Sequence, residues 1–375
     1  MVELGTLITQ AKTVRCGESN YPVLSMTMHD GLVLQDDRFK KAIASKDKSD
    51  YKVVYRDQLV ISFPIDEGVL ATQRITDAGI VSPAYGIWDV DQEKVVPEFL
   101  EYALRCKRSI AYYKAKLRGS TARRRSLPTP TLLAHTVPLP SIEEQKYVLD
   151  LIHKVETIIH LRKDELKELD ALTKARFVEM FGDPTYNPKG YKIKKLSQLG
   201  ELNRGVSKAR PRNSPELLGG PYPLVQTGEV TASELYINTY ENTYSEKGLA
   251  QSRMWPKGTL CITIAANIAQ TAILNIDACF PDSVVGFIPG KEVTQIYMHY
   301  WFTFFQKILE EQAPQVAQKN INLKILNDLD VMVPERTLQE QFEKLVNQTD
   351  KSKLLEVRQA GFIAKNRPTN ISFCR

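Results

Sequence analysis

The feature that most restricts how this chain folds is a stretch of about 40 residues, 141–181, that neither glycine nor proline interrupts. Its apolar residues recur at heptad positions, at Val148, Ile152, Val155, Ile159, Leu166 and Leu169. A helix of this length extends for about 60 Å, which is too long for burial inside one ordinary domain. We therefore predict a long amphipathic helix that connects two domains and pairs with a second helix in coiled-coil contact.

Short segments before this helix recur after it. The repeated segments are 21–24 and 222–225, 59–62 and 260–263, 85–88 and 285–288, and 137–140 and 331–334. Because the pairs keep the same order at a separation of about 200 residues, they indicate an internal duplication.

A helix start of similar design follows each copy. Ser141 with Glu144, and Thr337 with Glu340, have the spacing of a capping box, in which the hydroxyl accepts from a helical amide and the glutamate reaches back. The next residues are Gln145 and Gln341. We therefore predict that two helices begin at equivalent points and that the second, shorter helix is closed by Gly361 and Pro368 and pairs antiparallel with part of the first.

Each copy otherwise consists mainly of short strands and turns, so the predicted fold class is α+β: two similar globular domains joined by long antiparallel coiled-coil helices. Segments rich in β-branched and aromatic residues predict strands at 51–54, 58–63, 79–90, 259–264, 271–276 and 283–288. Helical patterns follow at 97–117 and 294–312. The predicted domains are a first globule at 1–140, a central helix at 141–182, a second globule at 183–335, and a C-terminal helix and tail at 336–375.

The net charge is only +6, but basic residues gather on both sides of the long helix. Residues 102–142 contain no acidic side chain, and residues 184–215 contain only Glu201. A solvated surface explains one such block by itself, whereas two blocks around one helix favour contact with the phosphates of a nucleic acid.

Loops at equivalent places in the two copies supply the candidate DNA-binding residues. Residues 123–125 align with 317–319, residues 204–208 form a basic loop in which Gly205 would let the backbone approach a phosphate, and residues 26–30 differ from 226–229. The candidates are Lys116, Arg118, Arg123, Arg124, Arg125, Arg204, Lys208, Arg210, Gln226, Thr227, Gln318, Lys319 and Asn320. Because the loops differ, we expect the two copies to make different contacts.

No catalytic or metal-binding pattern is complete. The five cysteines form no Cys-x-x-Cys pair, so we expect buried free thiols and no metal site. Residues 183–186 lie one residue from an amino-methyltransferase motif, but no glycine-rich cofactor loop accompanies them, and no P-loop occurs. No apolar run reaches the length of a membrane span, and residues 1–10 lack the order of a signal peptide. We therefore expect a cytoplasmic, non-catalytic protein without a cofactor of its own.

Pro138-Leu139-Pro140, Glu144-Gln145, the long helix and Phe181-Gly182-Asp183 resemble the central conserved region of type I restriction-modification specificity subunits. The order globule, helix, globule, helix resembles that family's two target recognition domains separated by conserved helices. The chain departs from the pattern at its end, because residues 367–375 contain no second Phe-Gly-Asp.

The resemblance implies that each globule reads one half of a bipartite target in double-stranded DNA and that the helices set the spacing. It also implies that two methyltransferase (modification) subunits dock on the helices, and we assign this docking to the stripe of Val148, Ile152, Val155, Ile159, Leu166 and Leu169. Motor-nuclease (restriction) subunits would join them, and the partners would carry S-adenosylmethionine, Mg²⁺ and ATP. The alternatives are a specificity chain of another multisubunit methylation or phage-defence system, or an independent DNA methyltransferase or nuclease.

Overall fold

The structure is a computed structural model that describes residues 1–28, 30–35, 48–117, 127–212, 214–264, 268–305, 308 and 321–365, with the backbone alone from 351 to 365. The chain divides into two compact units, one formed by Met1–Lys163 with Val357–Arg375 and the other by Asp164–Glu356. The boundary between them falls within the long helix α5 (Ile142–Phe181).

The first unit is built on a four-stranded antiparallel sheet. Its strand order is β2 (Ile8–Gln10), β9 (Gly86–Val90), β6 (Leu59–Ile61) and β7 (Leu70–Thr72). Three strand pairs adjoin it: β1 (Val2–Glu3) with β10 (Thr136–Val137), β3 (Leu24–Thr27) with β4 (Gly31–Leu34), and β5 (Lys52–Tyr55) with β8 (Ala78–Val81). The helices are α2 (Pro97–Arg105), α3 (Lys107–Lys116) and α4 (Thr129–Leu133). Leu59 and Leu100 lie in its core together with Val148, Leu149 and Ile152 of α5.

The second unit contains a five-stranded sheet in the order β12 (Gly200–Arg204), β20 (Val284–Pro289), β17 (Leu260–Thr263), β18 (Thr271–Leu274) and β14 (Tyr236–Ile237). A second sheet has the order β15 (Asn242–Tyr244), β13 (Leu218–Leu224), β19 (Ala278–Cys279) and β16 (Met254–Trp255), and β11 (Lys192–Lys195) pairs with β21 (Asp330–Val333). The helices are α6 (Thr227–Ala232), α7 (Glu246–Ala250), α8 (Gln295–Phe302), α10 (Leu323–Asn327) and α11 (Arg336–Lys365).

The two units share one scaffold. The order β2-β9-β6-β7 of the first unit recurs as β12-β20-β17-β18 in the second. Leu59 pairs with Trp88 across the first sheet, and its counterpart Leu260 pairs with Phe287 across the second. The predicted α+β class and the internal duplication are therefore confirmed, down to the register of individual strands.

Two predicted elements are each divided in the structure. Residues 79–90 form β8 and β9, which a turn at residues 82–85 separates. Residues 97–117 form α2 and α3, because Cys106 adopts an extended conformation and its carbonyl accepts the amide of Ile110 to begin a new helix. Cys106, Cys16, Cys261 and Cys279 are buried free thiols, as expected.

The starts of the two long helices are only partly as predicted. Ser141 and Glu144 form the expected capping box: the Glu144 amide donates to Ser141 Oγ at 3.3 Å, and the Ser141 amide donates to Glu144 Oε2 at 2.9 Å. The second box is wrong, because α11 begins at Arg336 and Thr337 lies inside it.

The alignment of the two helix starts also needs correction. The Gln339 amide donates to the Glu335 carbonyl, as the Gln145 amide donates to the Ser141 carbonyl, so Gln339 and not Gln341 corresponds to Gln145. Helix α11 also continues through Gly361 to Lys365, since one helical glycine costs only about 1 kcal/mol. None of the helices in the described ranges is long and apolar enough to cross a membrane.

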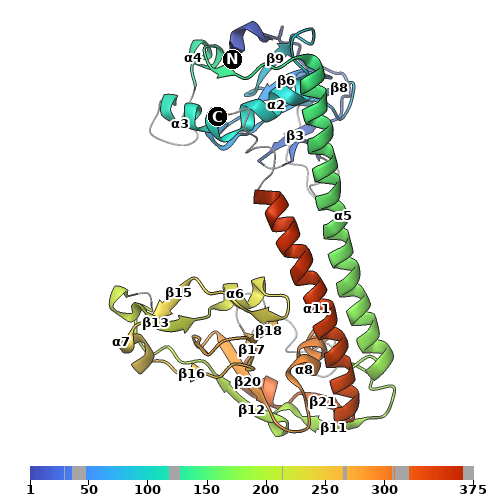
Figure 1. Ribbon diagram of the computed structural model, residues 1–375, viewed down its shortest axis with the longest axis vertical. Coiled ribbons are helices and arrows are strands. Elements are labelled where there is room, and N and C mark those ends of the chain that lie inside the picture. The colour runs from blue at the N-terminus through green and yellow to red at the C-terminus, as the bar shows by residue number, and fades with distance from the viewer. Residues whose placement is uncertain are drawn as a thin grey trace. The chain divides into compact units, whose positions relative to one another are not determined.

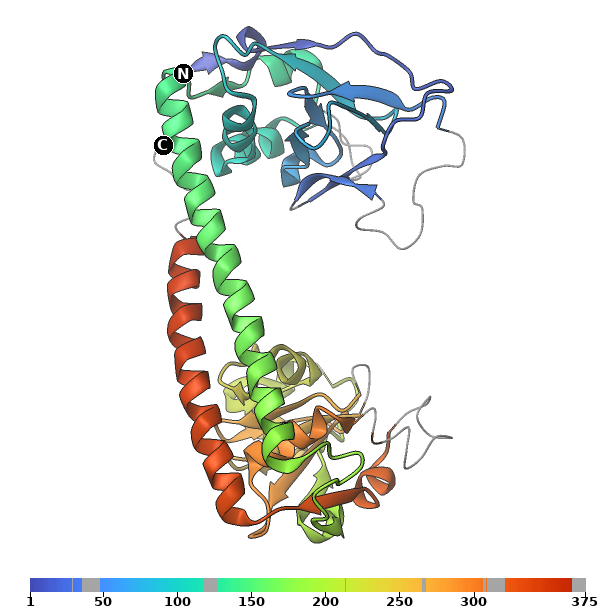
Figure 2. The same cartoon turned by 90° about the vertical axis from the view of Figure 1, so that its right-hand side faces the viewer.

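Helices α5 and α11 pair within the second unit, where they run side by side (Figure 1, Figure 2). The ring of Phe342 on α11 contacts Phe177 and Phe181 of α5, with 5.5 Å between centroids in both pairs. Further along α11, Val346 lines the same hollow as Asp170 of α5, so the residue numbers run in opposite directions. The predicted antiparallel pairing is confirmed.

We expect Phe342→Ala to lower the free energy of unfolding by about 3–5 kcal/mol, because it removes a fully buried ring and leaves a cavity between two helices. Denaturant titration followed by circular dichroism measures this change. The control is Leu172→Ala on the exposed side of α5, which should change the free energy by about 0.5 kcal/mol or less. Equal effects of the two substitutions would contradict the helix pairing.

Candidate nucleic-acid interface

The basic loop after β12 in the second unit is organised around one carboxylate. Arg204 Nε donates to the Asp282 carbonyl at 3.0 Å, and the Asp282 carboxylate lies 2.6 Å from the guanidinium of Arg212 and 3.7 Å from that of Arg210. The side chains of Arg210 and Arg212 remain 57% and 44% exposed. Three arginines around one aspartate leave a net positive charge at a fixed place, which suits contact with a phosphate.

Other polar contacts fix the backbone of the same loop. The amides of Lys208 and Ala209 both donate to Gln251 Oε1, at 2.7 and 3.0 Å, and Arg210 donates to the Ser207 carbonyl at 2.8 Å. The Lys208 side chain is exposed.

Gly205 has a different role from the one predicted. A Cβ atom there would lie 2.4 Å from the carbonyl oxygens of Phe280 and Pro281, so this glycine admits the chain's own backbone and not a phosphate.

Glu201 is the only acidic residue of the predicted basic block, and it is already paired. Arg253 donates to Glu201 Oε1 at 2.8 Å, and this hydrogen bond holds the pKa of Glu201 below its usual value. The Arg253 guanidinium also lies 4.0 Å from the ring centroid of Trp255. The ionised carboxylate of Glu201 therefore neutralises the charge of Arg253 and not that of Arg204 or Arg210, so the loop keeps its positive charge.

The segments that differ in sequence between the two copies also differ in structure. Val23 forms a parallel bridge with Ile80 in the first unit, as Leu224 does with Cys279 in the second. The differing segments therefore begin at equivalent points of the two units. In the first unit a tight turn joins β3 to β4, whereas the second unit has helix α6. Gln226 is exposed beside the half-buried Thr227 at the start of α6, and its amide donates to Glu229 Oε2 at 3.0 Å.

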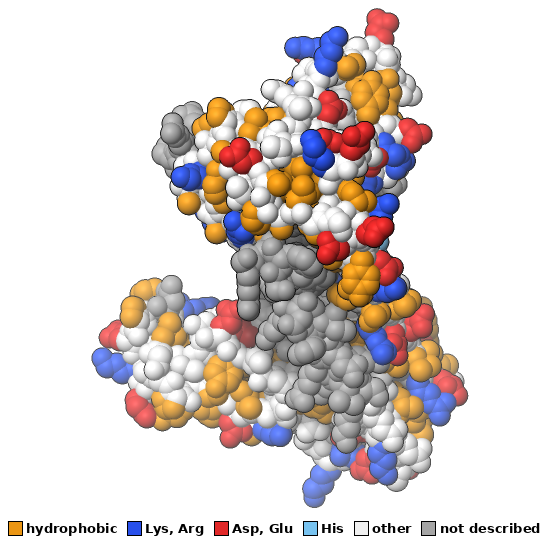
Figure 3. All heavy atoms as spheres, turned by 45° about the horizontal axis from the view of Figure 1, so that its top comes forward, with side chains coloured by type: hydrophobic (Ala, Val, Ile, Leu, Met, Phe, Trp, Pro, Cys, Tyr) orange, Lys and Arg blue, Asp and Glu red, His pale blue; other side chains and the backbone are white. Residues whose placement is uncertain are grey.

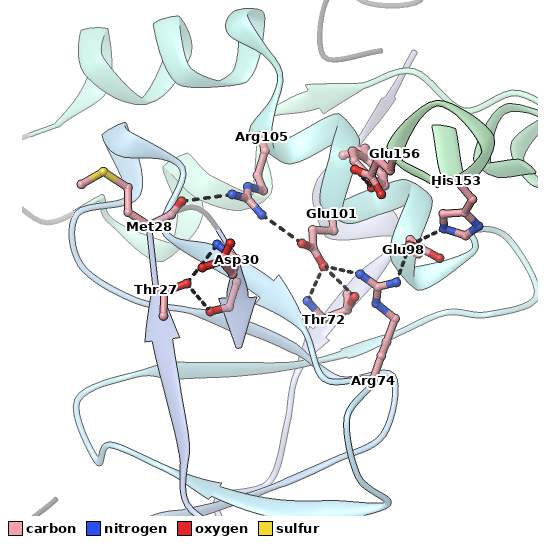
Figure 4. A network of polar contacts seen from close by, with 12 residues as sticks. Thr27, Met28, Asp30, Thr72, Arg74, Glu98, Glu101, Arg105, His153 and Glu156 are labelled. Atoms are coloured by element: carbon pink, nitrogen blue, oxygen red, sulfur yellow. Dashed lines mark hydrogen bonds and ion pairs between the residues drawn. The ribbon is translucent and has the colours of Figure 1, made fainter. Parts of the chain in front are cut away.

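The buried carboxylate of Glu101 anchors the β3–β4 turn through Arg105 (Figure 4). Arg105 donates to the Met28 carbonyl at 3.1 Å and to Glu101 Oε1 at 3.2 Å. Glu101 Oε2 accepts both the amide and the hydroxyl of Thr72 at 2.8 Å. Gly31, the first residue of β4, follows the turn directly. It has a positive φ of 66°, at which a residue with a side chain would be strained.

A second ion-paired group adjoins this carboxylate. Arg74 pairs with Glu98, which also meets His153 of α5 at 2.8 Å (Figure 4). The turn is therefore anchored to α2, and α2 in turn to α5.

The structure brings only some of the predicted DNA-binding residues together. Arg204, Lys208 and Arg210 share one loop, and Lys116 is exposed in the last turn of α3. Lys107 and Lys114 of the same helix, with Arg105, border a shallow hollow floored by Ile110 and Ala111. The residues outside the described ranges are Arg118, Arg123, Arg124, Arg125, Gln318, Lys319 and Asn320.

Charge is mixed on the face of the molecule that Figure 3 draws. On the face drawn in Figure 3, blue Lys and Arg side chains are interspersed with red Asp and Glu side chains. Among the residues that the structure describes, no group of three or more His, Cys, Asp or Glu side chains is arranged to hold a metal ion. The candidate contacts therefore lie at individual loops and turns.

The predicted docking stripe on α5 needs correction. Val148 and Ile152 lie in the core of the first unit, Ile159 is buried as well, and Val155, Leu166 and Leu169 are half-buried. A heptad pattern selects the face that the chain buries against itself, so Val148 and Ile152 are not accessible to another subunit.

A different face of α5 is apolar and exposed in the first unit. Its residues are Tyr147, Leu151, Ile158 and Leu161, with exposures of 64%, 41%, 46% and 63%. These positions follow one another at helical intervals and share one side of the helix. We call them the exposed face of α5.

We expect Glu101→Gln to lower the free energy of unfolding by about 1–3 kcal/mol, because an amide cannot serve Arg105 and Thr72 as the buried carboxylate does. Denaturant titration measures the loss, and amide exchange at Thr72 should become faster. The control is Asp77→Asn in the exposed pair with Arg56, which should leave stability unchanged. Unaltered exchange at Thr72 in the Glu101 variant would show that this carboxylate does not anchor the turn.

Comparison with known proteins shows what the chain is similar to. Residues 188–359 match the family model of the type I restriction modification DNA specificity domain. The putative type I restriction enzyme MjaX specificity subunit of Methanocaldococcus jannaschii is 22% identical over 72% of this chain and 64% of its own length. The MjaIX specificity subunit of the same organism is 28% identical over 31% of this chain and 27% of its own length. The chain thus spans less than two thirds of either relative.

Solved structures share the fold. A chain from a structure on complex assembly and conformational transition of the type I R-M system aligns with a TM-score of 0.60 at 17% identity, covering 100% of this chain and 97% of that one. The type I restriction-modification S subunit from M. genitalium aligns with a TM-score of 0.51 at 13% identity, covering 100% and 95%. The chain therefore matches a type I restriction modification DNA specificity domain in its second half and is similar, over 72% of its length, to a putative type I restriction enzyme specificity subunit.

Proposed function

We propose that this chain is the DNA sequence-specificity subunit of a type I restriction-modification complex and that each globule reads one half of a bipartite target. The observation that carries the proposal is a duplicated scaffold with different segments at equivalent places: the paired strands β3 and β4 follow Val23 in the first unit, and helix α6 follows Leu224 in the second. Two readers of one design with different contact segments suit a target whose halves differ in sequence.

The basic loop of the second unit supports contact with the DNA backbone. Its arginines are held by Asp282 yet remain partly exposed, so little side-chain freedom is lost when they meet a phosphate. Phosphate contacts set the position of a protein on the duplex, and nearby side chains such as Gln226 would then read base edges.

The long helix supports a fixed spacing between the half-sites. Helix α5 is continuous over 40 residues, and its two ends belong to different cores. A continuous helix is stiffer than an irregular linker, so it would hold the gap of unread base pairs constant.

We assign catalysis to partner subunits, in the cytoplasm where the DNA lies. Two modification subunits with S-adenosylmethionine would dock on the long helices, and restriction subunits with ATP and Mg²⁺ would join them. The exposed face of α5 offers large apolar side chains for such docking, of the kind that soluble chains otherwise bury in an interface.

One alternative is a specificity chain of another multisubunit methylation or phage-defence system. The same duplicated scaffold would serve it, and the subunits that purify with the chain distinguish the two. An independent methyltransferase or nuclease is the third candidate, and binding of S-adenosylmethionine by the isolated chain would favour it.

We expect the double substitution Arg210→Ala and Arg212→Ala to weaken DNA binding and to flatten its salt dependence. Removal of one phosphate-neutralising side chain lowers the slope of log K against log salt by about 0.9. Fluorescence anisotropy between low and moderate salt measures the slope. The control, Lys154→Ala with Lys167→Ala, removes the same charge from exposed pairs on α5 and should leave the slope unchanged. A slope that falls equally in both variants would mean that net charge matters and the loop does not.

We expect Leu151→Glu with Leu161→Glu to abolish copurification of the modification subunits, because both charges fall on the exposed face of α5. Binding of non-specific DNA by the isolated chain should persist, which shows that the chain still folds. Lys163→Glu changes the charge of the same helix by the same amount at an exposed position on the other side, and it should retain the partners. Retention of the partners by the double variant would remove this face from the interface.

A further inference from the structure

Gln145 joins three segments of the first unit from a fully buried position. Its side chain is 0% exposed. The amide oxygen accepts the backbone N–H of Val96 at 2.8 Å, and the amide nitrogen donates to the carbonyls of Lys94 at 3.2 Å and Pro140 at 2.8 Å. Val96 is the N-cap residue of α2, and Pro140 immediately precedes Ser141, the N-cap residue of α5. One side chain therefore ties the start of α2 to the start of α5.

Gln339 makes the same three bonds in the second unit, where it is also 0% exposed. Its amide oxygen accepts the N–H of Thr294 at 2.9 Å, and its amide nitrogen donates to the carbonyls of Glu292 and Pro334, both at 2.9 Å. Thr294 is the N-cap residue of α8, and Pro334 lies two residues before the first residue of α11. The two units thus use one joint between the globule and its long helix.

Only an amide of this length fits the joint. Each site presents one N–H and two carbonyls, all in the backbone, and glutamine supplies one acceptor and two donated hydrogens. Glutamate would place a carboxylate against both carbonyls, and an apolar residue would leave three buried backbone groups without partners. The bonds connect the long helix to the loop before the shorter helix and to the proline that precedes the long helix. They therefore restrict both the tilt and the rotation of the long helix on its globule.

We propose that Gln145 and Gln339 are positioning residues that fix the angle at which each long helix leaves its globule, and thereby the number of base pairs between the two half-sites. This inference rests on the proposed reading of a bipartite target. It assigns the gap to two joints inside the globules in addition to the length of the helices.

A long helix amplifies a small change at its joint. Over the 40 residues of α5, about 60 Å, a tilt of about 5° moves the far end by about 5 Å. Successive base pairs are about 3.4 Å apart, so this displacement exceeds one base pair. A loosened joint would therefore accept neighbouring gap lengths, whereas the bases read by each globule would stay the same.

The experiment uses the chain in complex with its modification subunits and a set of duplexes that carry the native half-sites. The half-sites are first determined by methylome sequencing with the wild-type chain, and the gap is then varied one base pair at a time. Gln145→Glu keeps the acceptor for Val96 and loses both donations. Ser141→Ala is the matched control, because it weakens the same helix start by about 1 kcal/mol without touching the joint.

The wild-type complex should prefer its native gap over gaps one base pair longer or shorter by at least about tenfold. In the Gln145→Glu complex this ratio should fall to about threefold or less, with unchanged half-site bases, while Ser141→Ala keeps the wild-type ratio. A wild-type ratio in the Gln145 variant would overturn the proposal, as would changed half-site bases. If that variant does not fold, Gln339→Glu gives the same test in the other unit. A wild-type complex without any bipartite preference would instead refute the proposed function.

Discussion

The structure depends on one helix that supplies core residues to two globules. Helix α5 inserts Val148, Leu149 and Ile152 into the core of the first unit, and Phe177 and Phe181 into the core of the second. Burial of such side chains contributes roughly 1.5–3 kcal/mol each, so both ends of the helix are held by its own domains. Its direction relative to the first globule is then decided at its N-terminal end, where the capping box and the buried Gln145 act.

Local signals in the sequence predicted the elements of this fold well. The period of apolar residues and the Ser141–Glu144 box located α5, and runs of β-branched residues located central strands such as β6, β17 and β20, because these patterns reflect contacts within a few residues. The second helix start was misplaced by the same reasoning. Thr337 and Glu340 have the spacing of a capping box, but the buried contacts of Gln339 with distant residues such as Thr294 accompany a helix start two positions earlier, at Arg336.

Only the part of the candidate site in which basic residues follow one another closely in the sequence was predictable. The basic loop of Arg204, Lys208 and Arg210 stands out in the sequence, whereas Asp282, which organises it, lies 78 residues from Arg204 and forms no local pattern. The docking stripe on α5 failed for a related reason. A heptad pattern identifies the most apolar face of a helix but does not say whether the chain's own globule or another subunit covers it.

Comparison of the two copies shows which side chains differ between them and which hydrogen bonds both keep. Lys94 in the first joint corresponds to Glu292 in the second, a reversal of charge, yet both contribute only a backbone carbonyl. All six hydrogen bonds of the two glutamines reach backbone atoms, so neighbouring side chains can change without altering either joint. The segments beyond Val23 and Leu224, which we propose to contact the target, are a pair of strands in one unit and a helix in the other on that constant frame. Under the proposed function, a scaffold built in this way lets the bases that each unit reads vary while the distance between the half-sites is kept.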